Sequence, residues 1–430
     1  TDHSPCIEGH SGKIRCNRST YPYGDWSADG IHAEDSSNVY LKNLNIHGFA
    51  HAGILAGRLR DWTLERVRIA FNGWAGWDGD LPVGNSINRG KMIFREVTVE
   101  WNGCGETYPG GKPIGCWGQS AGGYGDGLGT AETGGKWVFT DCKFLHNTSD
   151  GLDLRYHHLD GDITIDRLHS EGNASNAVQT TGSTFITNSV LVGNCAYFKG
   201  KSFTHNVDHC RYRGNTLEIF YRAGAQATLA NSTLYGEGDV LVSLGERVGY
   251  TCNGTESFNA INNIFYATTD YHQPFEKAAL SYVQKCKGMK FKADYSVTYN
   301  VKGPCKVGPN DICADPKMGP YTGDRYGMVP GPGSPAIDSG KKVGNLCLKG
   351  EVGEGDVVGA GRGSELGNFP TREEAIGQVI GAAMAPASQI ASCLIAPGGA
   401  MAALLKTIEE SAESEAPAEA EAPAEEAAAE

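Results

Sequence analysis

Three eleven-residue segments with one pattern decide the fold: WTLERVRIAFN (62–72), MIFREVTVEWN (92–102) and WVFTDCKFLHN (137–147). In each segment, two alternating apolar residues, a two-residue break and two more alternating apolar residues are followed three places on by Asn. Alternation with a period of two predicts short strands that bury one face. The constant break between the two strands predicts a corner of fixed shape that recurs along the chain.

Further copies of the pattern begin at Val39, Ile163, Phe185, Ala227 and Phe258, so the repeat interval is 22 to 45 residues. The copy at Phe185 is taken to bury Phe185, Thr187, Val190 and Val192, with Asn194 one place early. A second short element of the type Asp/Asn-Gly/Ala-apolar precedes several copies, which gives three strands per coil. Coils of this kind bury their apolar edges only against their neighbours, and parallel connections are right-handed. We therefore predict an all-β chain, a right-handed parallel β-helix with three sheets.

The composition along the chain divides it into four parts. We expect an N-terminal cap over residues 1–28 and the parallel β-helix over 29–366, with inserted loops at 71–90 and 101–125. An Ala-rich helical segment follows at 367–410, and a disordered acidic tail at 411–430. Of the net charge of −13, −9 lies in residues 367–430. The body is thus close to neutral, and no nucleic-acid partner is expected for it.

Cysteines and glycosylation sequons predict a secreted, extracellular chain. Twelve of the 13 cysteines precede residue 350 and form no CxxC pair, which favours disulfides; Cys6 with Cys16 and Cys104 with Cys116 are the expected pairs. The chain begins at Thr1 rather than Met, as a processed chain does, and no apolar run is long enough to span a membrane. The predicted glycosylation sites are Asn17, Asn147, Asn173, Asn231 and Asn253. Buried thiols and chance sequons in an Asn-rich repeat are the alternative.

Two aspartates 24 residues apart, Asp126 and Asp150, each begin an equivalent strand in successive coils. Stacked coils lie about 4.8 Å apart, so the two carboxylates are expected one above the other. Like charges at that distance repel unless a cation lies between them. Asp153 offers a further oxygen ligand, and we predict a Ca²⁺ site at these three residues. The alternative is that Asp-Gly only makes the turn into each strand.

The segments YGDGLG (124–129) and NTSDGLDL (147–154) resemble the calcium motifs of pectate lyases of polysaccharide lyase family nine. The resemblance spans about residues 29–200 and implies that Asp126, Asp150 and Asp153 bind calcium. It also implies a base that removes the C5 proton of a uronate. Gln179 stands at the position of that base, so Lys199 and Lys201, one coil later, are the candidate catalytic residues.

Aromatic residues in the expected loops are candidates for stacking on sugar rings, and local packing is the alternative for them. These residues are Trp74, Trp77, Trp101, Tyr108, Trp117 and Tyr124. The first hypothesis is thus a secreted protein that binds an acidic polysaccharide with calcium, and cleaves it by β-elimination if it is an enzyme. The second is a non-catalytic, glycosylated structural subunit of a fibre or surface layer that self-assembles through its ends or tail.

The segment beginning FPTREE (369–374) opens a helix with a capping box and leads into Ala-rich stretches broken at Pro386 and Pro397. Over about 369–410 it resembles the C-terminal helix of the bacterial ribosomal stalk-base protein, which implies docking of stalk dimers and a cytoplasmic setting. A fusion, an engineered chain or an assembly error would join such a tail to a secreted body. The alternative is an Ala-rich amphipathic helix that packs on the solenoid end or on another chain.

Overall fold

The computed structural model describes residues 9–10, 13–14, 29–49, 51–81, 85–106, 113–116, 125–157, 160–198, 214–247, 249–268, 279–284, 286–319 and 329–341. Contacts divide the chain into two units, Thr1–Asp356 and Val357–Glu430, and the described residues all belong to the first. The predicted helical segment and acidic tail lie outside the described residues, as do Cys6 and Cys16. Within the described part, no helix is both long and apolar enough to cross a membrane.

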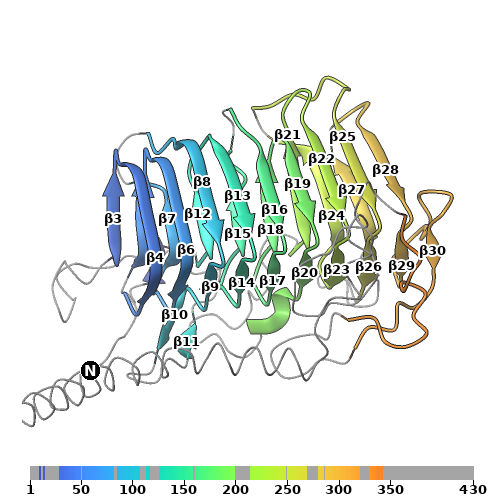
Figure 1. Ribbon diagram of the computed structural model, residues 1–430, viewed down its shortest axis with the longest axis horizontal. Helices are drawn as coiled ribbons and strands as arrows, with labels where there is room; N and C mark the ends of the chain where they lie inside the picture. Colours follow the sequence, from blue (N-terminus) through green and yellow to red (C-terminus); the bar gives the residue numbers. More distant parts are fainter. Residues whose placement is uncertain are drawn as a thin grey trace, which may run out of the picture. The chain divides into compact units, whose positions relative to one another are not determined.

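A nine-stranded parallel sheet forms one side of the solenoid (Figure 1). Most neighbouring strands in this sheet are 23 to 26 residues apart in register, and the longer steps contain additional chain between the strands, so each coil adds one strand to the sheet. Its strands are β3 (Ile31–Glu34), β5 (Ala52–Gly57), β7 (Ala75–Gly79), β12 (Leu128–Thr130), β15 (Leu152–Leu154), β18 (Val178–Thr181), β21 (Leu217–Tyr221), β24 (Val240–Glu246) and β27 (Ala279–Gln284).

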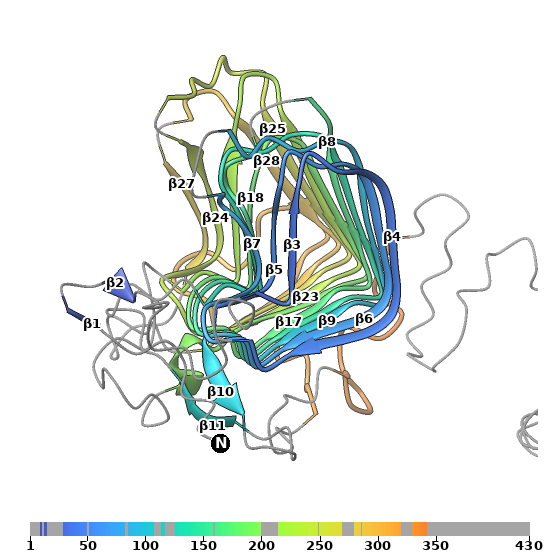
Figure 2. The ribbon, with the colours of Figure 1, turned by 90° about the vertical axis from the view of Figure 1, so that its left-hand side faces the viewer.

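A 17-stranded parallel sheet forms the other two sides, because strands β4 and β6 continue around the corner between them (Figure 2). The first of these sides contains β8 (Arg89–Arg95), β13 (Lys136–Thr140), β16 (Ile163–Asp166), β19 (Thr184–Thr187), β22 (Gln226–Ala230), β25 (Ser257–Ile261) and β28 (Lys290–Asp294). The second contains β9 (Thr98–Glu100), β14 (Lys143–Leu145), β17 (His169–Glu171), β20 (Val190–Gly193), β23 (Thr233–Gly236), β26 (Ile264–Ala267), β29 (Val297–Tyr299) and β30 (Ile312–Cys313). The two bent strands are β4 (Ser37–His47) and β6 (Arg60–Ala70). The described body is therefore a parallel β-helix.

The remaining described elements lie outside the coils. Two short antiparallel pairs are β1 (Gly9–His10) with β2 (Lys13–Ile14), and β10 (Cys104–Glu106) with β11 (Pro113–Cys116). A single 3₁₀ turn, η4, spans Cys195–Phe198. The predicted disulfide between Cys104 and Cys116 is confirmed, and it joins β10 to β11.

The two-residue break of the repeat is the corner between the two sides of the 17-stranded sheet. The residue just before the second apolar pair has a left-handed backbone, with φ between 51° and 58°. This residue is Asn43, Arg66, Glu96, Asp141, Arg167, Asn188, Asn231, Asn262 or Tyr295, depending on the coil. Because a left-handed residue turns the chain without disturbing the strands on either side, the break has the same length in every coil.

The repeated Asn forms a buried ladder along the solenoid. The amide nitrogen Nδ2 of Asn72 donates to Oδ1 of Asn102 at 2.9 Å, and the same bond joins Asn102 to Asn147 and Asn147 to Asn173 at 2.9 Å each. All four side chains are at most 2% exposed. The constant spacing of Asn in the repeat thus stacks these side chains on one another. Each then has hydrogen-bond partners that a buried polar group at the turn would otherwise lack.

The coil at Phe185 has a different register from the predicted one. Ile165 pairs with Ile186, so Thr184 and Ile186 face the interior while Phe185 is partly exposed. A shift of one residue exchanges the two faces of a strand, and it also restores Asn194 to the ordinary spacing after Leu191. The stretch 71–90, predicted to be an inserted loop, also differs: it contains β7, a regular strand of the nine-stranded sheet.

Candidate functional site

The outer face of the nine-stranded sheet carries one row of polar side chains parallel to the solenoid axis. The strand pairing aligns Asp78, Gly129, Asp153, Gln179, Glu218 and Ser243, one from each coil. Their neighbours Trp77, Leu152 and Val178 belong to the core, so these polar residues point outward. We call Asp78, Asp153, Gln179, Glu218 and Ser243 the outer row. Gly129 leaves a gap in it, beside Oδ2 of Asp126.

The predicted residues Asp126 and Asp150 lie side by side at the beginning of adjacent strands. Oδ1 of Asp126 accepts a hydrogen bond from the backbone N–H of Asp150 at 2.9 Å, and Oδ1 of Asp150 accepts one from Asn176 at 2.7 Å. Asn176 in turn accepts from the N–H of Asn215 at 2.8 Å. We call Asp126, Asp150, Asn176 and Asn215 the strand-start column, since each of the first three caps the next coil.

The fold alone does not require the charges of this column. Asn176 makes the same hydrogen bond with an uncharged amide oxygen that Asp126 and Asp150 make with a carboxylate. The two aspartates are 6% and 3% exposed, so their carboxylates lose most of their hydration. A buried charge that the backbone does not need is costly, and such groups are typical of functional sites.

Burial and mutual repulsion change the titration of these carboxylates. Burial, together with the charge of Asp126, raises the pKa of Asp150 to about 6. Burial also raises the pKa of Asp153 well above its usual value, although the Arg155 guanidinium opposes this shift. In the outer row, loss of hydration raises the pKa of Asp78 to about 6 against the attraction of His51.

The described residues fit a calcium ion in part. One oxygen of Asp126 and one of Asp150 are not used in capping the next coil, and a cation between them would remove their repulsion. Asp153 is differently placed: Oδ1 accepts from the backbone of Arg155 at 2.8 Å, and Oδ2 pairs with the Arg155 guanidinium at 3.1 Å. Asp126, Asp150 and Asp153 also do not bring three ligand atoms within 4.8 Å of one another in the described structure.

Of the residues at or near the expected position of the base, the structure describes Gln179 but not the two lysines. Gln179 lies in the outer row next to Asp153, where the alignment of the repeats puts it. Its Nε2 donates to Glu218, which fixes the orientation of the amide, and the side chain is 3% exposed. Lys199 and Lys201 lie outside the described residues.

The three aromatic candidates that the structure describes have different environments. The prediction for Trp77 is wrong: it is 0% exposed and packs against Trp62, Phe94 and Trp137 inside the solenoid. Trp74 is partly exposed and stacks on His51, with ring centroids 5.5 Å apart. Trp101, also partly exposed, stacks on His146 at the same corner of the solenoid, one coil further along. Tyr108, Trp117 and Tyr124 lie outside the described residues.

Two of the predicted glycosylation sites are incompatible with the fold. Asn147 and Asn173 belong to the buried Asn ladder, where their Nδ2 groups donate to neighbouring residues, so a glycan has no access to them. Asn231 is partly buried and donates to Asn188. Asn253 is exposed, and Asn17 lies outside the described residues.

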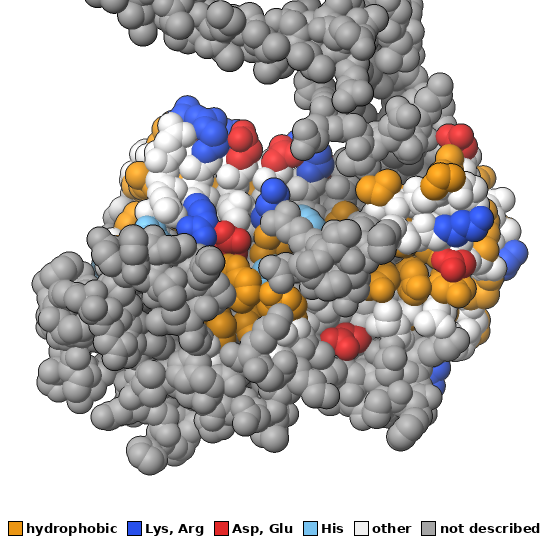
Figure 3. All heavy atoms as spheres, turned by 90° about the horizontal axis from the view of Figure 1, so that it is seen from below, with side chains coloured by type: hydrophobic (Ala, Val, Ile, Leu, Met, Phe, Trp, Pro, Cys, Tyr) orange, Lys and Arg blue, Asp and Glu red, His pale blue; other side chains and the backbone are white. Residues whose placement is uncertain are grey.

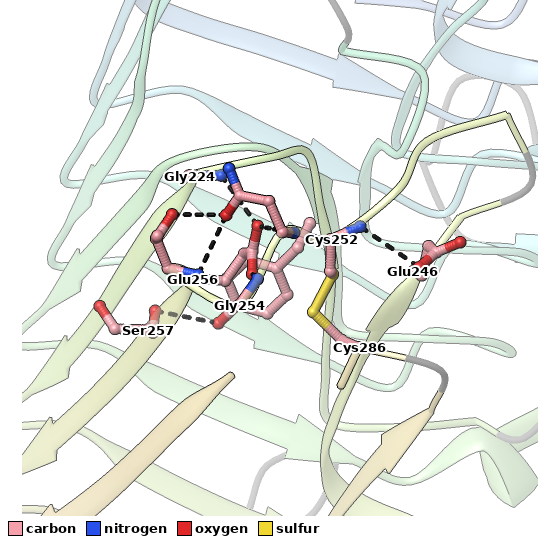
Figure 4. The surroundings of a disulfide bond; sticks show 10 residues. Gly224, Glu246, Cys252, Gly254, Glu256, Ser257 and Cys286 are labelled. Atoms are coloured by element: carbon pink, nitrogen blue, oxygen red, sulfur yellow. Dashed lines mark hydrogen bonds between the residues drawn. A yellow bond between two sulfur atoms is a disulfide. The ribbon is translucent and has the colours of Figure 1, made fainter. Parts of the chain in front are cut away.

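A second acidic group, beside a disulfide, has a structural role. Cys252, Glu256 and Cys286 bring one potential ligand atom each within 4.8 Å of the others, but the two cysteines form a disulfide (Figure 4). Glu256 is 0% exposed and accepts backbone N–H bonds from Gly224, Asn253 and Gly254. Burial opposes its ionisation, but these donors lower the pKa of Glu256 below its usual value. A further disulfide joins Cys305 to Cys313.

Sequence reasoning missed three members of this face: Asp78, Glu218 and Arg155. Asp78 lies in the Gly-rich stretch read as a loop, and Glu218 follows the long interval after Asn194 in which the repeat is interrupted. A signal for Arg155 was present, since it lies two residues after Asp153 in an alternating segment and therefore points to the same side.

The pH dependence of stability tests the burial of Asp150. The folded chain holds a proton on Asp150 up to about pH 6, whereas the unfolded chain releases it near the usual pKa of 3.8. In chelator, the free energy of unfolding should therefore fall as the pH rises from about 4 to about 6, by up to about 3 kcal/mol from this group. Asp150→Asn should flatten this slope in denaturant titrations, while Asp141→Asn, at an exposed corner, should not. Equal slopes in wild type and Asp150→Asn would contradict the assignment.

The fold and this face define the chain as a parallel β-helix with a polar row and two buried carboxylates on one outer side. No protein-family model and no curated protein matches the chain. A solved structure similar to it is endo-xylogalacturonan hydrolase from Aspergillus tubingensis, with 8% sequence identity, a TM-score of 0.29 and coverage of 67% of this chain and 79% of that chain. A TM-score this low does not establish a common fold, so the assignment to the parallel β-helices rests on the strand pairing of the chain itself.

Proposed function

We propose that this chain is an extracellular protein that binds an acidic polysaccharide along the outer row. The observation that supports this most is the pair of buried carboxylates, Asp126 and Asp150, whose charge the backbone does not need. The outer row beside them repeats once per coil, and the coil spacing is close to the length of one sugar unit. Disulfides between described residues are in keeping with an oxidising compartment.

A calcium ion held by Asp126 and Asp150 would give these carboxylates a role in the binding. It would neutralise their repulsion and accept the carboxylate of a uronate as a further ligand. Figure 3 shows another side of the solenoid, seen from below, where described side chains of both charge signs are interspersed. No field of one sign is therefore seen on that side, and the proposed binding depends on the pair of carboxylates.

Cleavage by β-elimination is the enzymatic form of this proposal. A base removes the C5 proton of the uronate, a double bond forms between C4 and C5, and the bond from C4 to the glycosidic oxygen breaks, so that this oxygen leaves and takes up a proton. Lys199 or Lys201 would be the base, since Gln179 does not accept a proton at neutral pH.

Binding to polygalacturonate with and without calcium tests the proposal. Isothermal titration should show calcium binding to the wild type and at least tenfold weaker binding of polygalacturonate in chelator. Asp150→Asn keeps the oxygen that caps Asn176, so it should fold normally and lose the calcium dependence. Asp141→Asn, on another side of the solenoid, should behave as the wild type.

Equal affinity for polygalacturonate and an uncharged glucan would contradict the proposed function. For the enzymatic form, ultraviolet absorbance of unsaturated products should rise on incubation with calcium, and its absence with any uronate polymer would leave a binding protein.

A further inference from the structure

Three arginines lie together at one edge of the nine-stranded sheet. Each follows directly after a strand: Arg155 after β15, Arg222 after β21 and Arg247 after β24. Strands β21 and β24 are neighbours, and their register pairs Tyr221 with Glu246. Arg222 and Arg247 therefore occupy the next matched position, on adjacent coils. Like charges at matched positions of neighbouring strands are unfavourable unless an opposite charge lies near them.

Tyr156 holds two of these arginines in place. The guanidinium of Arg247 lies over the Tyr156 ring, 3.9 Å from its centroid, and that of Arg155 lies 5.0 Å from the same centroid. Nη1 of Arg247 also donates to the backbone carbonyl of Arg155 at 2.9 Å. Stacking on an aromatic ring leaves the edge of a guanidinium free to donate hydrogen bonds in its plane. We call Tyr156, Arg222 and Arg247 the arginine cluster.

The three arginines differ in the opposite charges that lie near them. Arg155 pairs with Asp153 of the outer row at 3.1 Å. Arg222 is attracted by Asp160 and Asp162, which are both exposed. Arg247, in contrast, forms no ion pair with any residue in the described ranges, although Glu246 precedes it. The carboxylate of Glu246 accepts instead from the backbone N–H of Cys252 at 3.3 Å.

The arginine cluster lies beside the outer row, just after the ends of strands that belong to the row. Arg155 is two residues beyond Asp153 on the same face of its strand, and its carbonyl also accepts from the hydroxyl of Thr181 on the next strand. A polymer that lies along the outer row thus has Arg155 and Arg247 to one side of it. A planar guanidinium fork matches an oxyanion with two equivalent oxygens, such as a carboxylate or a sulfate ester.

We infer that Arg222 and Arg247, with Tyr156 as support, form a subsite for the anionic group of one sugar unit in the polysaccharide bound along the outer row. This inference rests on the proposed function and identifies how its ligand is recognised. The shared chemistry is an oxyanion on a glycan, which is a carboxylate in a uronate and a sulfate ester in a sulfated sugar. The anionic group would pair with Arg247, which forms no ion pair with the described residues, beside Arg222 on the neighbouring strand.

Affinity measurements with three glycans test the subsite. The wild type is titrated with polygalacturonate, with fully methyl-esterified pectin, whose carboxyl groups are uncharged, and with chondroitin sulfate. We expect the wild type to prefer at least one anionic glycan over the methyl ester by tenfold or more. Arg247→Gln should remove this preference and leave the affinity for the methyl ester unchanged. Arg247→Lys should restore only part of it, because lysine has no planar fork.

The control variant is Arg167→Gln, an exposed arginine that pairs with Asp141 and Asp166 at a corner of the 17-stranded sheet. It should retain the preference. A preference for polygalacturonate assigns the subsite to a carboxylate, and a preference for chondroitin sulfate assigns it to a sulfate. If Arg247→Gln folds with an unchanged melting temperature and keeps the preference, the subsite is refuted while the proposed function stands. If the wild type binds none of the three glycans, both are refuted.

Discussion

Replacing Asn147 by alanine is expected to lower the free energy of unfolding by about 4 kcal/mol. The side chain makes four hydrogen bonds inside the solenoid. Oδ1 accepts from the backbone N–H and from Nδ2 of Asn102, at 3.2 and 2.9 Å, and Nδ2 donates to Val99 O and to Asn173 Oδ1, at 3.1 and 2.9 Å. Alanine leaves these partners buried without a hydrogen bond, at a cost of about 1–3 kcal/mol for each group that does not relax.

Urea titration followed by circular dichroism measures this loss. The control is Asn259→Ala, an exposed position in the middle of β25, which should change the midpoint little. A loss below about 1 kcal/mol for Asn147→Ala would show that water or a rearranged neighbour replaces the ladder. The mass of the wild type expressed through a secretory pathway provides a second readout, because Asn147 lies in a sequon that the fold should keep unglycosylated.

Replacing Trp77 by alanine is expected to cost a similar amount, about 3–5 kcal/mol, because it empties the largest volume in the core of its coil. Trp77 packs against Trp62, Phe94 and Trp137, with ring centroids 5.5 to 6.5 Å apart, and it is 0% exposed. These rings come from four different strands, so the cavity cannot close by movement of one neighbour.

The matched control is Trp74→Ala, three residues away. Trp74 is partly exposed and stacks on His51, so its loss should cost about 1 kcal/mol or less. The melting temperatures of the two variants show whether each tryptophan lies in the core or at the surface. Should Trp77→Ala melt with the wild type and bind polygalacturonate more weakly, Trp77 would instead be a surface residue that stacks on sugar.

The coils could be predicted from the sequence because two strictly local rules determine them. Alternation sets which residues face inward, and one left-handed residue per corner sets the break, so both are visible within eleven residues of WTLERVRIAFN. The register failed at Phe185, where Phe185, Thr187 and Val190 mimic the buried pattern but Thr184 and Ile186 face the core. Periodicity alone cannot distinguish apolar residues on the outer face of a coil from core residues, because both alternate with a period of two.

The candidate site was predicted only in part, for a different physical reason. Asp126 and Asp150 are one coil apart, and the repeat interval puts them together. The arginine cluster brings Tyr156 together with Arg222 and Arg247 across the long interval after Asn194, and no local pattern predicts the strand register beyond that interval. Partners of an individual side chain, such as the pairing of Asp153 with Arg155, depend on rotamers that sequence spacing does not specify.

The strand-start column has a consequence for how the binding position of such a protein can change in evolution. Asn176 and Asp150 make the same bond to the backbone of the next coil, so exchanging Asp for Asn at this position adds or removes a charge and leaves the main chain as it was. Two single-residue exchanges would therefore transfer the charged pair one coil along the axis. A solenoid of this kind can relocate a binding position by point mutation, in steps of one sugar unit, without inserting or deleting a residue.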